Sequence, residues 1–338
     1  MLLAGGLSTR LYPLTKTVPK PLVPVAGVPN AVHLIKYLKS HGYDEIAINV
    51  HYLAGAITSA LGDGSAFGVR LEYLHEATLM GSAGALKPMQ DFFGNDTFVV
   101  VGCDDLTDLP LDKLTALHER RRAVATIGLV EREHVDQYGV VVIDPDGRIT
   151  GFQEKPAPGT ERSKLVNTGI YVFSPQIFER IPADTFYDFG KQVFPELLAD
   201  GLRFYGYDAG DAYWCDIGTP SEYRRASADV VNGVFRIPDT RPNGADPTAR
   251  IAGSATIDPN VWIGARARIG ERVRIAGPSV IGDGTVVEDG ASVEASIVWE
   301  ASTIGAGAQL RDAIVGKDTQ IDAGAELAGD IVASCQPV

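Results

Sequence analysis

Short apolar runs alternate with amphipathic stretches over the first two thirds of the chain. Four of these runs predict buried strands, at residues 45–50, 69–74, 97–102 and 123–130. Between Pro29 and Gly42, apolar residues recur at helical spacing and predict a helix, and residues 111–122 show the same pattern. Strands that alternate with helices need crossover connections, so we expect an α/β domain with a mostly parallel sheet covered by helices on both faces. The first apolar run is short, so we expect the native chain to start two or three residues upstream of Met1.

The last third of the chain has a different hydrophobic period. Aliphatic residues recur every six positions from Ile251 to Val293, and after two five-residue steps the series ends at Leu327. This hexapeptide period is typical of a left-handed parallel β-helix, in which each short face points one aliphatic side chain inward. A polar, turn-rich stretch precedes the repeat. We therefore expect an α/β domain over residues 1–232, a linker over 233–247 and a β-helix domain over 248–332.

The composition is that of a globular protein with an excess of acids. The 338 residues carry a formal net charge of -13, which argues against nucleic acids and membrane surfaces as partners because both are polyanionic. No apolar run approaches the ~20 residues that span a bilayer, and we expect no signal peptide. The three cysteines, Cys103, Cys215 and Cys335, do not make a disulfide framework. We therefore expect a cytoplasmic protein.

The first thirty residues contrast with this charge because they contain no Asp or Glu. Gly5 and Gly6 follow the first strand, where ligands of such sheets bind, and the exposed N–H groups of a glycine-rich turn bind phosphate. Arg10, Lys16 and Lys20 supply cations, and the prolines of this stretch hold them near fixed positions. The stretch predicts a triphosphate site. The alternative is a loop whose cations are solvated.

Acidic residues follow two other apolar runs. Asp104 and Asp105 come directly after the strand predicted at 97–102, and Asp216 lies in the apolar stretch "WCDI". An acid at the carboxyl end of a strand near a phosphate site is a natural Mg²⁺ ligand, and an acid in an apolar context needs a partner. Two carboxylates on one Mg²⁺ would satisfy both requirements. The alternative for Asp104 and Asp105 is a helix cap or a solvated loop.

Three further motifs add polar groups suited to a sugar phosphate. "FQEKP" contains Glu154 and Lys155, "NTGIYVF" contains Asn167, Thr168 and Gly169, and "DFGK" contains Asp188 and Lys191. Each motif is weak alone, because a lysine on a loop is usually solvated. Together they predict a second cation site with several groups that can meet hydroxyls.

These motifs occur together in one protein family. The chain contains, in this order and before the hexapeptides, "AGGLSTRLYPLTKTVPKPLVPVAGVP", "MGSAGAL", "CDDLTDL", "FQEKP", "NTGIYVF", "DFGKQVFP" and "YWCDIGTP". It resembles the sugar-1-phosphate nucleotidyltransferases, or NDP-sugar pyrophosphorylases, that have a C-terminal left-handed β-helix, and it is most similar to the mannose-1-phosphate guanylyltransferase branch. The resemblance covers nearly the whole chain and implies a Rossmann-like nucleotidyltransferase catalytic domain before the linker.

The resemblance also implies roles for individual residues. The nucleoside triphosphate would contact Leu3, Gly5, Gly6, Ser8, Thr9, Arg10, Lys20, Met80, Gly81 and Ser82. The sugar phosphate would contact Glu154, Lys155, Asn167, Thr168, Gly169 and Asp188, with Lys155 on its phosphate. Mg²⁺ would bind Asp104 and Asp216. Catalysis would depend on Arg10, Lys20, Asp104, Lys155 and Asp216.

This sequence departs from the family at Ser8 and Cys103, where the family usually has glycine. Glycine at the first position permits a close backbone approach or a positive φ, and serine in a left-handed conformation would cost about 1 kcal/mol. A serine hydroxyl can also donate to a phosphate, so strain and phosphate contact are both open for Ser8. Neighbouring side chains of a strand point to opposite faces, so we expect Cys103 and Cys215 to be buried packing residues.

The implied reaction is an in-line displacement. An oxygen of the sugar 1-phosphate attacks the α-phosphorus of the nucleoside triphosphate and pyrophosphate leaves, with catalysis by positioning and charge neutralisation. GTP and mannose 1-phosphate are the favoured substrates. Glucose 1-phosphate with UTP, dTTP or ATP, and heptose 1-phosphate, are the alternatives. We expect a homo-oligomer, a dimer or tetramer, that forms through the β-helix.

Three other functions fit the sequence less well. Hexapeptide β-helices often carry acyltransferase sites that use histidine, but all six histidines precede residue 135. A catalytically inactive, nucleotide-sugar-sensing regulatory subunit should have lost its acids or cations, and the five catalytic candidates are all present. A nucleotide-dependent oxidoreductase would need the G-x-G-x-x-G fingerprint, which the chain lacks, as it lacks a Walker A motif. The sensor is the alternative of a different class.

Overall fold

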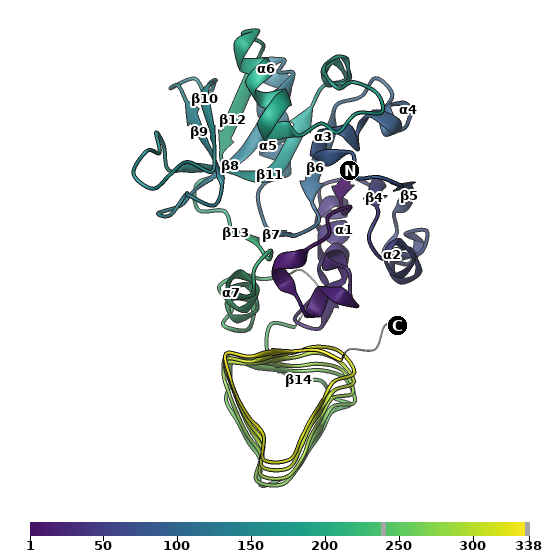
Figure 1. Cartoon of the computed structure of the whole chain (residues 1–338), viewed down its shortest axis with the longest axis vertical. Helices are drawn as coiled ribbons and strands as arrows, with labels where there is room; N and C mark the ends of the chain where they lie inside the picture. The colour runs from purple at the N-terminus through teal and green to yellow at the C-terminus, as the bar shows by residue number, and fades with distance from the viewer. Residues whose placement is uncertain (238–240, 335–338) are drawn as a thin grey trace. The chain divides into compact units, whose positions relative to one another are not determined.

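The protein divides into two compact units. A computed structural model describes residues 1–237 and 241–334. The first unit combines Met1–Leu7 with Leu34–Cys215, and the second combines Ser8–His33 with the chain from Asp216 onward. Figure 1 traces the chain from its purple N-terminus to the yellow β-helix coils. The predicted linker includes residues 238–240, which lie outside the described residues, as does Cys335.

A nine-stranded mixed sheet forms the centre of the first unit. Its order is β10 (Ile149–Glu154), β9 (Gly139–Ile143), β11 (Leu165–Phe173), β6 (Phe98–Gly102), β1 (Leu2–Leu3), β4 (Glu45–Val50) and β5 (Arg70–His75), and β8 (Ala125–Glu131) pairs with β11 and β12 (Phe204–Asp208). The pairs of β1 with β4 and β6, of β4 with β5 and of β8 with β12 are parallel. β11 is antiparallel to β6, β8 and β9, and β10 is antiparallel to β9. The α/β class is confirmed, but the sheet is mixed because the long β11 runs opposite to its neighbours.

Both helices predicted from the apolar spacing are present, at Asn30–Ser40 and Leu111–Arg121. The structure has α1 (Asn30–Ser40), α2 (Ala54–Leu61), α3 (Gly81–Gly84), α4 (Gln90–Phe93), α5 (Leu111–Arg121), α6 (Phe194–Ala199), 3-10 helices at Ser65–Phe67, Lys87–Met89 and Pro175–Arg180, and a π-helix at Phe189–Val193. A separate two-stranded sheet pairs β7 (Asp105–Thr107) with β13 (Trp214–Asp216). Aromatic rings fill much of the core of the first unit: the centroids of Phe93 and Phe98 are 4.2 Å apart, and those of Phe173 and Phe189 are 5.0 Å apart.

The N-terminal segment of the second unit is built from tight turns. Three 3-10 helices, η1 (Thr9–Leu11), η2 (Leu14–Lys16) and η3 (Lys20–Leu22), precede a hairpin of β2 (Pro24–Val25) and β3 (Val28–Pro29). Helix α7 (Pro220–Val231) begins after Thr219, whose hydroxyl accepts a hydrogen bond from the N–H of Glu222. Tyr223 on α7 donates to the carbonyl of Pro24 at 2.6 Å, so the helix is fixed to the hairpin.

The remainder of the second unit is a parallel β-helix with three faces (Figure 1). Its strands β14 to β29 are Gly244–Ala245, Arg250–Ile251, Thr256–Ile257, Val261–Ile263, Arg268–Ile269, Arg274–Ala276, Ser279–Ile281, Val286–Val287, Ser292–Glu294, Ile297–Val298, Thr303–Ile304, Gln309–Arg311, Ile314–Val315, Gln320–Ile321, Glu326–Ala328 and Ile331–Val332. The five-residue steps in the sequence shorten the later coils by one residue. Ile251 therefore pairs with Ile269, whereas Val298 pairs with Val315.

The periodic aliphatic residues fill the inside of this β-helix. Ile263 and Ile304, in its middle coils, are 1% and 0% exposed. Ile251 is 40% exposed because its strand is at the edge of its sheet, with a neighbour on one side only. Burial in the middle coils contributes about 1.5–3 kcal/mol for each such side chain, so the coils stabilise one another. Over the described residues, no helix has the length and apolar character needed to cross a bilayer.

Candidate active site

A buried pair of polar side chains holds the end of β1. Asn49 accepts a hydrogen bond from the Ala4 N–H (2.9 Å) and donates through Nδ2 to Oε2 of Glu76 (2.6 Å). Oε1 of Glu76 accepts from the N–H of Met80 (3.0 Å). A Cβ at Gly5 would be 2.7 Å from both Asn49 Nδ2 and Glu76 Oε2, so only glycine fits against the pair. Sequence reasoning missed Asn49 and Glu76, although an acid directly after a predicted strand was the available signal.

The turn at Met80–Ser82, predicted to contact the nucleotide, packs against the segment before the π-helix. Gly81 has φ +79, and a Cβ there would be 2.5 Å from the carbonyl oxygen of Tyr187. The hydroxyl of Ser82 donates to Oδ2 of Asp188 at 2.9 Å. Oδ1 of Asp188 accepts from the N–H of Gly190 at 3.0 Å and so caps the π-helix. Ser82 and Asp188, predicted for different substrates, therefore contact each other, and both Asp188 oxygens accept protein hydrogen bonds.

The carboxylates of Asp104 and Asp105 converge at the end of β6. A Cβ at Gly102 would be 2.8 Å from Oδ1 of Asp104 and 2.8 Å from Oδ2 of Asp105, so the glycine leaves room for both. Asp105 is 3% exposed and accepts a hydrogen bond from Nε1 of Trp214 at 2.9 Å. A Cβ at Gly169 would be 3.1 Å from Oδ2 of Asp105. Asp104 is half-buried and keeps more access to solvent than Asp105.

The "NTG" motif forms an irregularity in β11. The register with β8 shifts between Asn167 and Tyr171, and Gly169 has φ +78. Asn167 donates through Nδ2 to the hydroxyl of Tyr171 and accepts from the N–H of Gly169, both at 3.0 Å. Thr168 is 1% exposed, and its hydroxyl donates to the carbonyl of Gly128 at 2.7 Å. Thr168 therefore stabilises the irregularity from inside, while Asn167 is half-buried.

Glu154 and Lys155 lie at the end of β10 with exposed side chains. Lys155 has φ +45, and its N–H donates to the carbonyl of Tyr138 at 3.1 Å. A Cβ at Gly190 would be 2.9 Å from Oε2 of Glu154, so Glu154 lies beside the π-helix that Asp188 caps. Desolvation raises the pKa of the Glu154 carboxyl, and the charge of Lys155 opposes that shift. The structure thus brings together two of the three motifs predicted for the sugar phosphate.

Ser8 adopts the left-handed conformation that the family usually fills with glycine. Its φ is 54 and its ψ is 39, directly before η1. Its carbonyl accepts hydrogen bonds from the hydroxyl of Thr15 (2.7 Å) and the N–H of Leu11 (3.3 Å). Within the described part of the chain, the Ser8 hydroxyl makes no capping hydrogen bond to η1. The strain expected from the sequence is present, and the buried Thr15 helps to hold it. Thr9, the first residue of η1, is exposed.

Two predicted cations meet one predicted carboxylate in the second unit. Nζ of Lys20 is 3.3 Å from Oδ1 of Asp216, and Nη2 of Arg10 is 3.8 Å from Oδ2. Lys20 is 8% exposed, whereas the side chain of Arg10 is 59% exposed. A Cβ at Gly218 would be 2.6 Å from Asp216 Oδ1 and 2.7 Å from Arg10 Nη2. Sequence reasoning missed Gly218, whose missing side chain leaves room for the cluster.

The remaining predicted residues lie near the β1 strand and in the core. Leu3 ends β1, is half-buried, and its carbonyl accepts from the N–H of Cys103 at 3.0 Å. Gly6 is exposed, and apart from its chain neighbours no described atom lies within 4 Å of a Cβ position there. Cys103 and Cys215 are both buried and form no disulfide within the described residues. The prediction that they are buried residues is confirmed.

Metal binding was tested on the donor set of the first unit. No group of three or more His, Cys, Asp or Glu side chains is arranged as a metal site within residues 1–237 and 241–334. Carboxylate oxygens are nevertheless the ligands that Mg²⁺ prefers, with waters and substrate phosphates as the others. Asp104 and Asp105 supply such oxygens around the space that Gly102 leaves open. The residues present therefore fit Mg²⁺.

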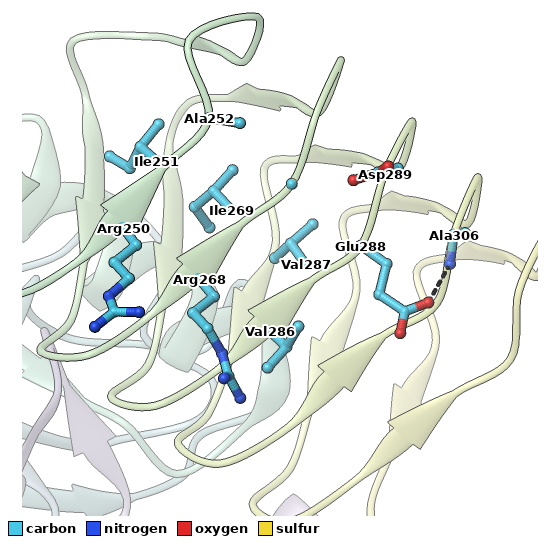
Figure 2. Close-up of a pocket in the computed structure, with 11 residues that line it drawn as sticks. Arg250, Ile251, Ala252, Arg268, Ile269, Val286, Val287, Glu288, Asp289 and Ala306 are labelled. Atoms are coloured by element: carbon cyan, nitrogen blue, oxygen red, sulfur yellow. Dashed lines mark hydrogen bonds between the residues drawn. The ribbon is translucent and has the colours of Figure 1, made fainter.

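A hollow lies on the β-helix, and none of the predicted site residues lines it. It has a volume of about 610 Å³ and is lined mainly by residues of β15, β18 and β21. Figure 2 shows Arg250 and Arg268 side by side on adjacent strands, and Glu288 accepting a hydrogen bond from the Ala306 N–H (2.9 Å). The described residues that line it include no histidine.

Comparison with known families defines the class of protein. Residues 1–233 match the family described as Nucleotidyl transferase, and residues 241–337 match the family described as GMPPB C-terminal domain. The chain belongs to the nucleotidyl transferase family. As the sequence predicted, it is an enzyme of the sugar-1-phosphate nucleotidyltransferase class.

Individual relatives fall on both sides of the predicted substrate choice. A UTP–glucose-1-phosphate uridylyltransferase of Synechocystis sp. is 40% identical over 92% of this chain and 85% of its own length. A mannose-1-phosphate guanylyltransferase of Mycobacterium tuberculosis is 36% identical over 71% of this chain and 67% of its own. A Bacillus anthracis structure described as a glucose-1-phosphate thymidylyltransferase has a TM-score of 0.60 and 28% identity, covering 67% of this chain and 92% of that one. The class is shared by all three, and the base and the sugar differ.

Proposed function

We propose that this protein transfers the guanylyl group of GTP to mannose 1-phosphate. An oxygen of the sugar phosphate attacks the α-phosphorus, the bond from that phosphorus to the β-phosphate oxygen breaks, and pyrophosphate leaves. The phosphate nucleophile is already ionised, so the step needs no general base. Arg10 and Lys20 bind the triphosphate and Lys155 binds the sugar phosphate. The reaction is accelerated because these groups position the substrates and neutralise their charge.

The observation that carries the choice of GTP is the buried carboxylate of Glu76. It lies against Gly5 and accepts the N–H of Met80, two residues predicted to contact the nucleotide. A carboxylate is an acceptor with about four lone-pair sites, and Asn49 and Met80 use two of them. Guanine offers two adjacent donors, N1–H and the 2-amino group, which one carboxylate accepts together. Uracil offers one N–H between two carbonyls, and a carboxylate repels the carbonyl oxygens.

UTP with glucose 1-phosphate is the second candidate. The 40% identity with the Synechocystis uridylyltransferase over almost the whole chain supports it. The named mannose-1-phosphate relatives, including the guanyltransferase of Schizosaccharomyces pombe at 32% identity, and the match of residues 241–337 support GTP and mannose 1-phosphate. Glu76 is the feature of this chain that separates the two candidates on chemical grounds.

We also propose Mg²⁺ as the cofactor, with Asp104 and Asp216 as protein ligands. Each acid is supported by its own surroundings: Asp104 has Asp105 beside the space at Gly102, and Asp216 has Lys20 and Arg10. When bound, the metal would neutralise charge on the phosphates.

Cellular location and assembly are part of the same proposal. We propose a cytoplasmic homo-oligomer that forms through the β-helix, where Ile251 exposes apolar surface at the edge of its sheet. Light scattering after size exclusion measures the assembly, and the variant Ile251→Glu should shift it toward the monomer. An unchanged mass for that variant would mean that the contact between subunits does not involve Ile251.

The substrate is tested by measuring pyrophosphate release across a matrix of substrates with Mg²⁺. The nucleotides are GTP, UTP, dTTP and ATP, and the sugars are mannose, glucose and heptose 1-phosphates. We expect the highest kcat/KM for GTP with mannose 1-phosphate. Release with UTP and glucose 1-phosphate but none with GTP would overturn this choice, and no release in any combination would favour the regulatory subunit.

The variant Glu76→Gln tests the role of the carboxylate in the same matrix. Its amide would repel one guanine donor, so the ratio of kcat/KM for GTP to that for UTP should fall at least about tenfold, the equivalent of roughly 1.4 kcal/mol. Glu72→Gln is the matched control, because Glu72 is exposed on β5 and pairs with Arg70. An unchanged ratio in Glu76→Gln would remove the argument for guanine.

A further inference from the structure

The β-helix contacts the segment that contains Lys20. This segment, Ser8–His33, belongs to the second unit together with α7 and the β-helix. Gly27 in the β2–β3 hairpin has φ +72 and lies flat against the ring of Trp262, where a Cβ would be 2.7 Å from Cζ2. A Cβ at Gly316 would be 3.2 Å from Cδ2 of Leu14. The segment that supplies two proposed catalytic cations therefore packs directly on the β-helix coils.

A buried hydrogen-bond chain leads from the β-helix into this segment. Nε1 of Trp299 donates to the hydroxyl of Tyr223 at 2.9 Å, and that hydroxyl donates to the carbonyl of Pro24 at 2.6 Å. Tyr223 is 0% exposed and Trp299 is 2% exposed. Burial raises the pKa of Tyr223, so the phenol stays neutral and can donate its hydrogen bond to the carbonyl of Pro24. An indole can only donate and a phenol can do both, so the direction of the chain is fixed.

Backbone hydrogen bonds connect the chain around Pro24 to Lys20. The N–H of Val23 donates to the carbonyl of Lys20 at 3.0 Å, and the N–H of Asn30 donates to the carbonyl of Val23 at 3.1 Å. Lys20 begins η3 and is 8% exposed. Its ammonium group therefore reaches Asp216 from a backbone position that Pro24 helps to set.

Helix α7 provides the second fixed point of this arrangement. It begins four residues after Asp216, and it holds Tyr223 in its first turn. Arg224, the next residue, donates to the carbonyl of Asp312 and to that of Gly329, both at 3.0 Å. The helix that follows the acid is thus anchored to the β-helix coils next to the residue that holds Pro24.

We propose that Trp299 and Tyr223 are positioning residues of the nucleotidyl transfer site, through which the β-helix sets the position of Lys20. Both act through the carbonyl of Pro24. This assigns the β-helix a part in catalysis and rests on the proposed role of Lys20 toward the triphosphate. A shift of about 1 Å in a catalytic group lowers the rate by up to about a hundredfold.

The variant Tyr223→Phe tests the proposal in the full chain, because it removes one hydroxyl and keeps the ring. Tyr37→Phe is the matched control: Tyr37 is 8% exposed, and its hydroxyl also donates to a backbone carbonyl, that of Leu109, in the first unit. Tyr37→Phe loses the buried hydrogen bond to Leu109, whereas Tyr223→Phe loses the one to Pro24 and the one from Trp299. We expect kcat/KM for the nucleotide to fall at least about tenfold in Tyr223→Phe only, with the KM for the sugar phosphate unchanged. Trp299→Phe should cause a smaller loss in the same direction.

A second measurement reads the position of Lys20 without any turnover. The rate at which an acylating reagent modifies Lys20 is followed by peptide mass spectrometry. We expect it to rise several-fold in Tyr223→Phe and to stay at the wild-type value in Tyr37→Phe. Equal labelling and equal kcat/KM in the two variants would overturn the proposal. A wild-type protein with no activity on any substrate would instead overturn the proposed function, while the labelling rates would still decide the role of Tyr223.

Discussion

The contact between Gly27 and Trp262 makes a quantitative prediction about stability. In Gly27→Ala the new Cβ would be 2.7 Å from Cζ2 and 2.9 Å from Cζ3 of Trp262, well inside van der Waals contact. Trp262 is 7% exposed and its ring lies 5.3 Å from the guanidinium of Arg241, so it has little room to move. Gly27 also has φ +72, where alanine is strained. Strain costs about 1 kcal/mol and overpacking costs a further 1–3 kcal/mol or so.

Gly233→Ala separates these two costs. Gly233 lies in the same unit and has φ +73, but apart from its chain neighbours no described atom is within 4 Å of a Cβ position there. The free energy of unfolding should fall by about 1 kcal/mol in Gly233→Ala, from strain alone, and by about 2–4 kcal/mol in Gly27→Ala. Urea unfolding followed by tryptophan fluorescence measures both, with the transition of the second unit fitted separately. A difference below about 0.5 kcal/mol would refute the packing of the hairpin on Trp262.

Three shorter predictions follow from single residues. Burial lowers the pKa of His118 to about 4, so the unfolded chain binds more protons than the folded chain between pH 4 and 6.5. The free energy of unfolding should therefore fall by roughly 2–3 kcal/mol as the pH drops through that window. Thermal unfolding measured against pH should show a flatter profile for His118→Gln than for the exposed His134→Gln. Asp104→Ala should lower turnover by orders of magnitude with unchanged thermal stability. Asp112→Ala, on the exposed side of α5, should leave turnover unchanged. Near-wild-type turnover in Asp104→Ala would contradict the metal assignment. Ser8→Gly should keep its kcat, and its free energy of unfolding should rise by at most about 0.5 kcal/mol, because the relief of strain is offset by the greater entropy of the unfolded chain. A large loss of activity would mean that the hydroxyl contacts the nucleotide.

Sequence reasoning succeeded where the structural cause is local. The β-helix was predicted because each coil repeats the same inward aliphatic position, and even the shorter late coils follow from the five-residue steps, as the pairing of Val298 with Val315 shows. For Ser8 the sequence left backbone strain and a phosphate contact open, and the structure shows the left-handed conformation. Strand positions were found for the same cause, since a buried run is visible in the sequence itself.

It failed where the cause is a contact between distant segments. Asn49 lies in β4 and Glu76 follows β5, and only the parallel pairing of these two strands brings their side chains together. The antiparallel direction of β11 was not predicted, because a buried strand has the same composition in either direction. Thr168 was assigned to the substrate from its motif, whereas its hydroxyl is directed inward to Gly128.

In the acid-free N-terminal segment, Arg10 and Lys20 lie beside Asp216, a carboxylate from almost two hundred residues away in the sequence. The two cations on that carboxylate are held differently. An exposed ion pair such as that of Arg10, at 3.8 Å, contributes about 0–1 kcal/mol, so Arg10 can turn toward a phosphate at little cost. Lys20 is buried, and loss of Asp216 would take an ion-pair partner away from a buried charge. Within the proposed reaction, Arg10 is therefore the cation that moves to the incoming triphosphate, and Lys20 is the one whose fixed position the β-helix maintains.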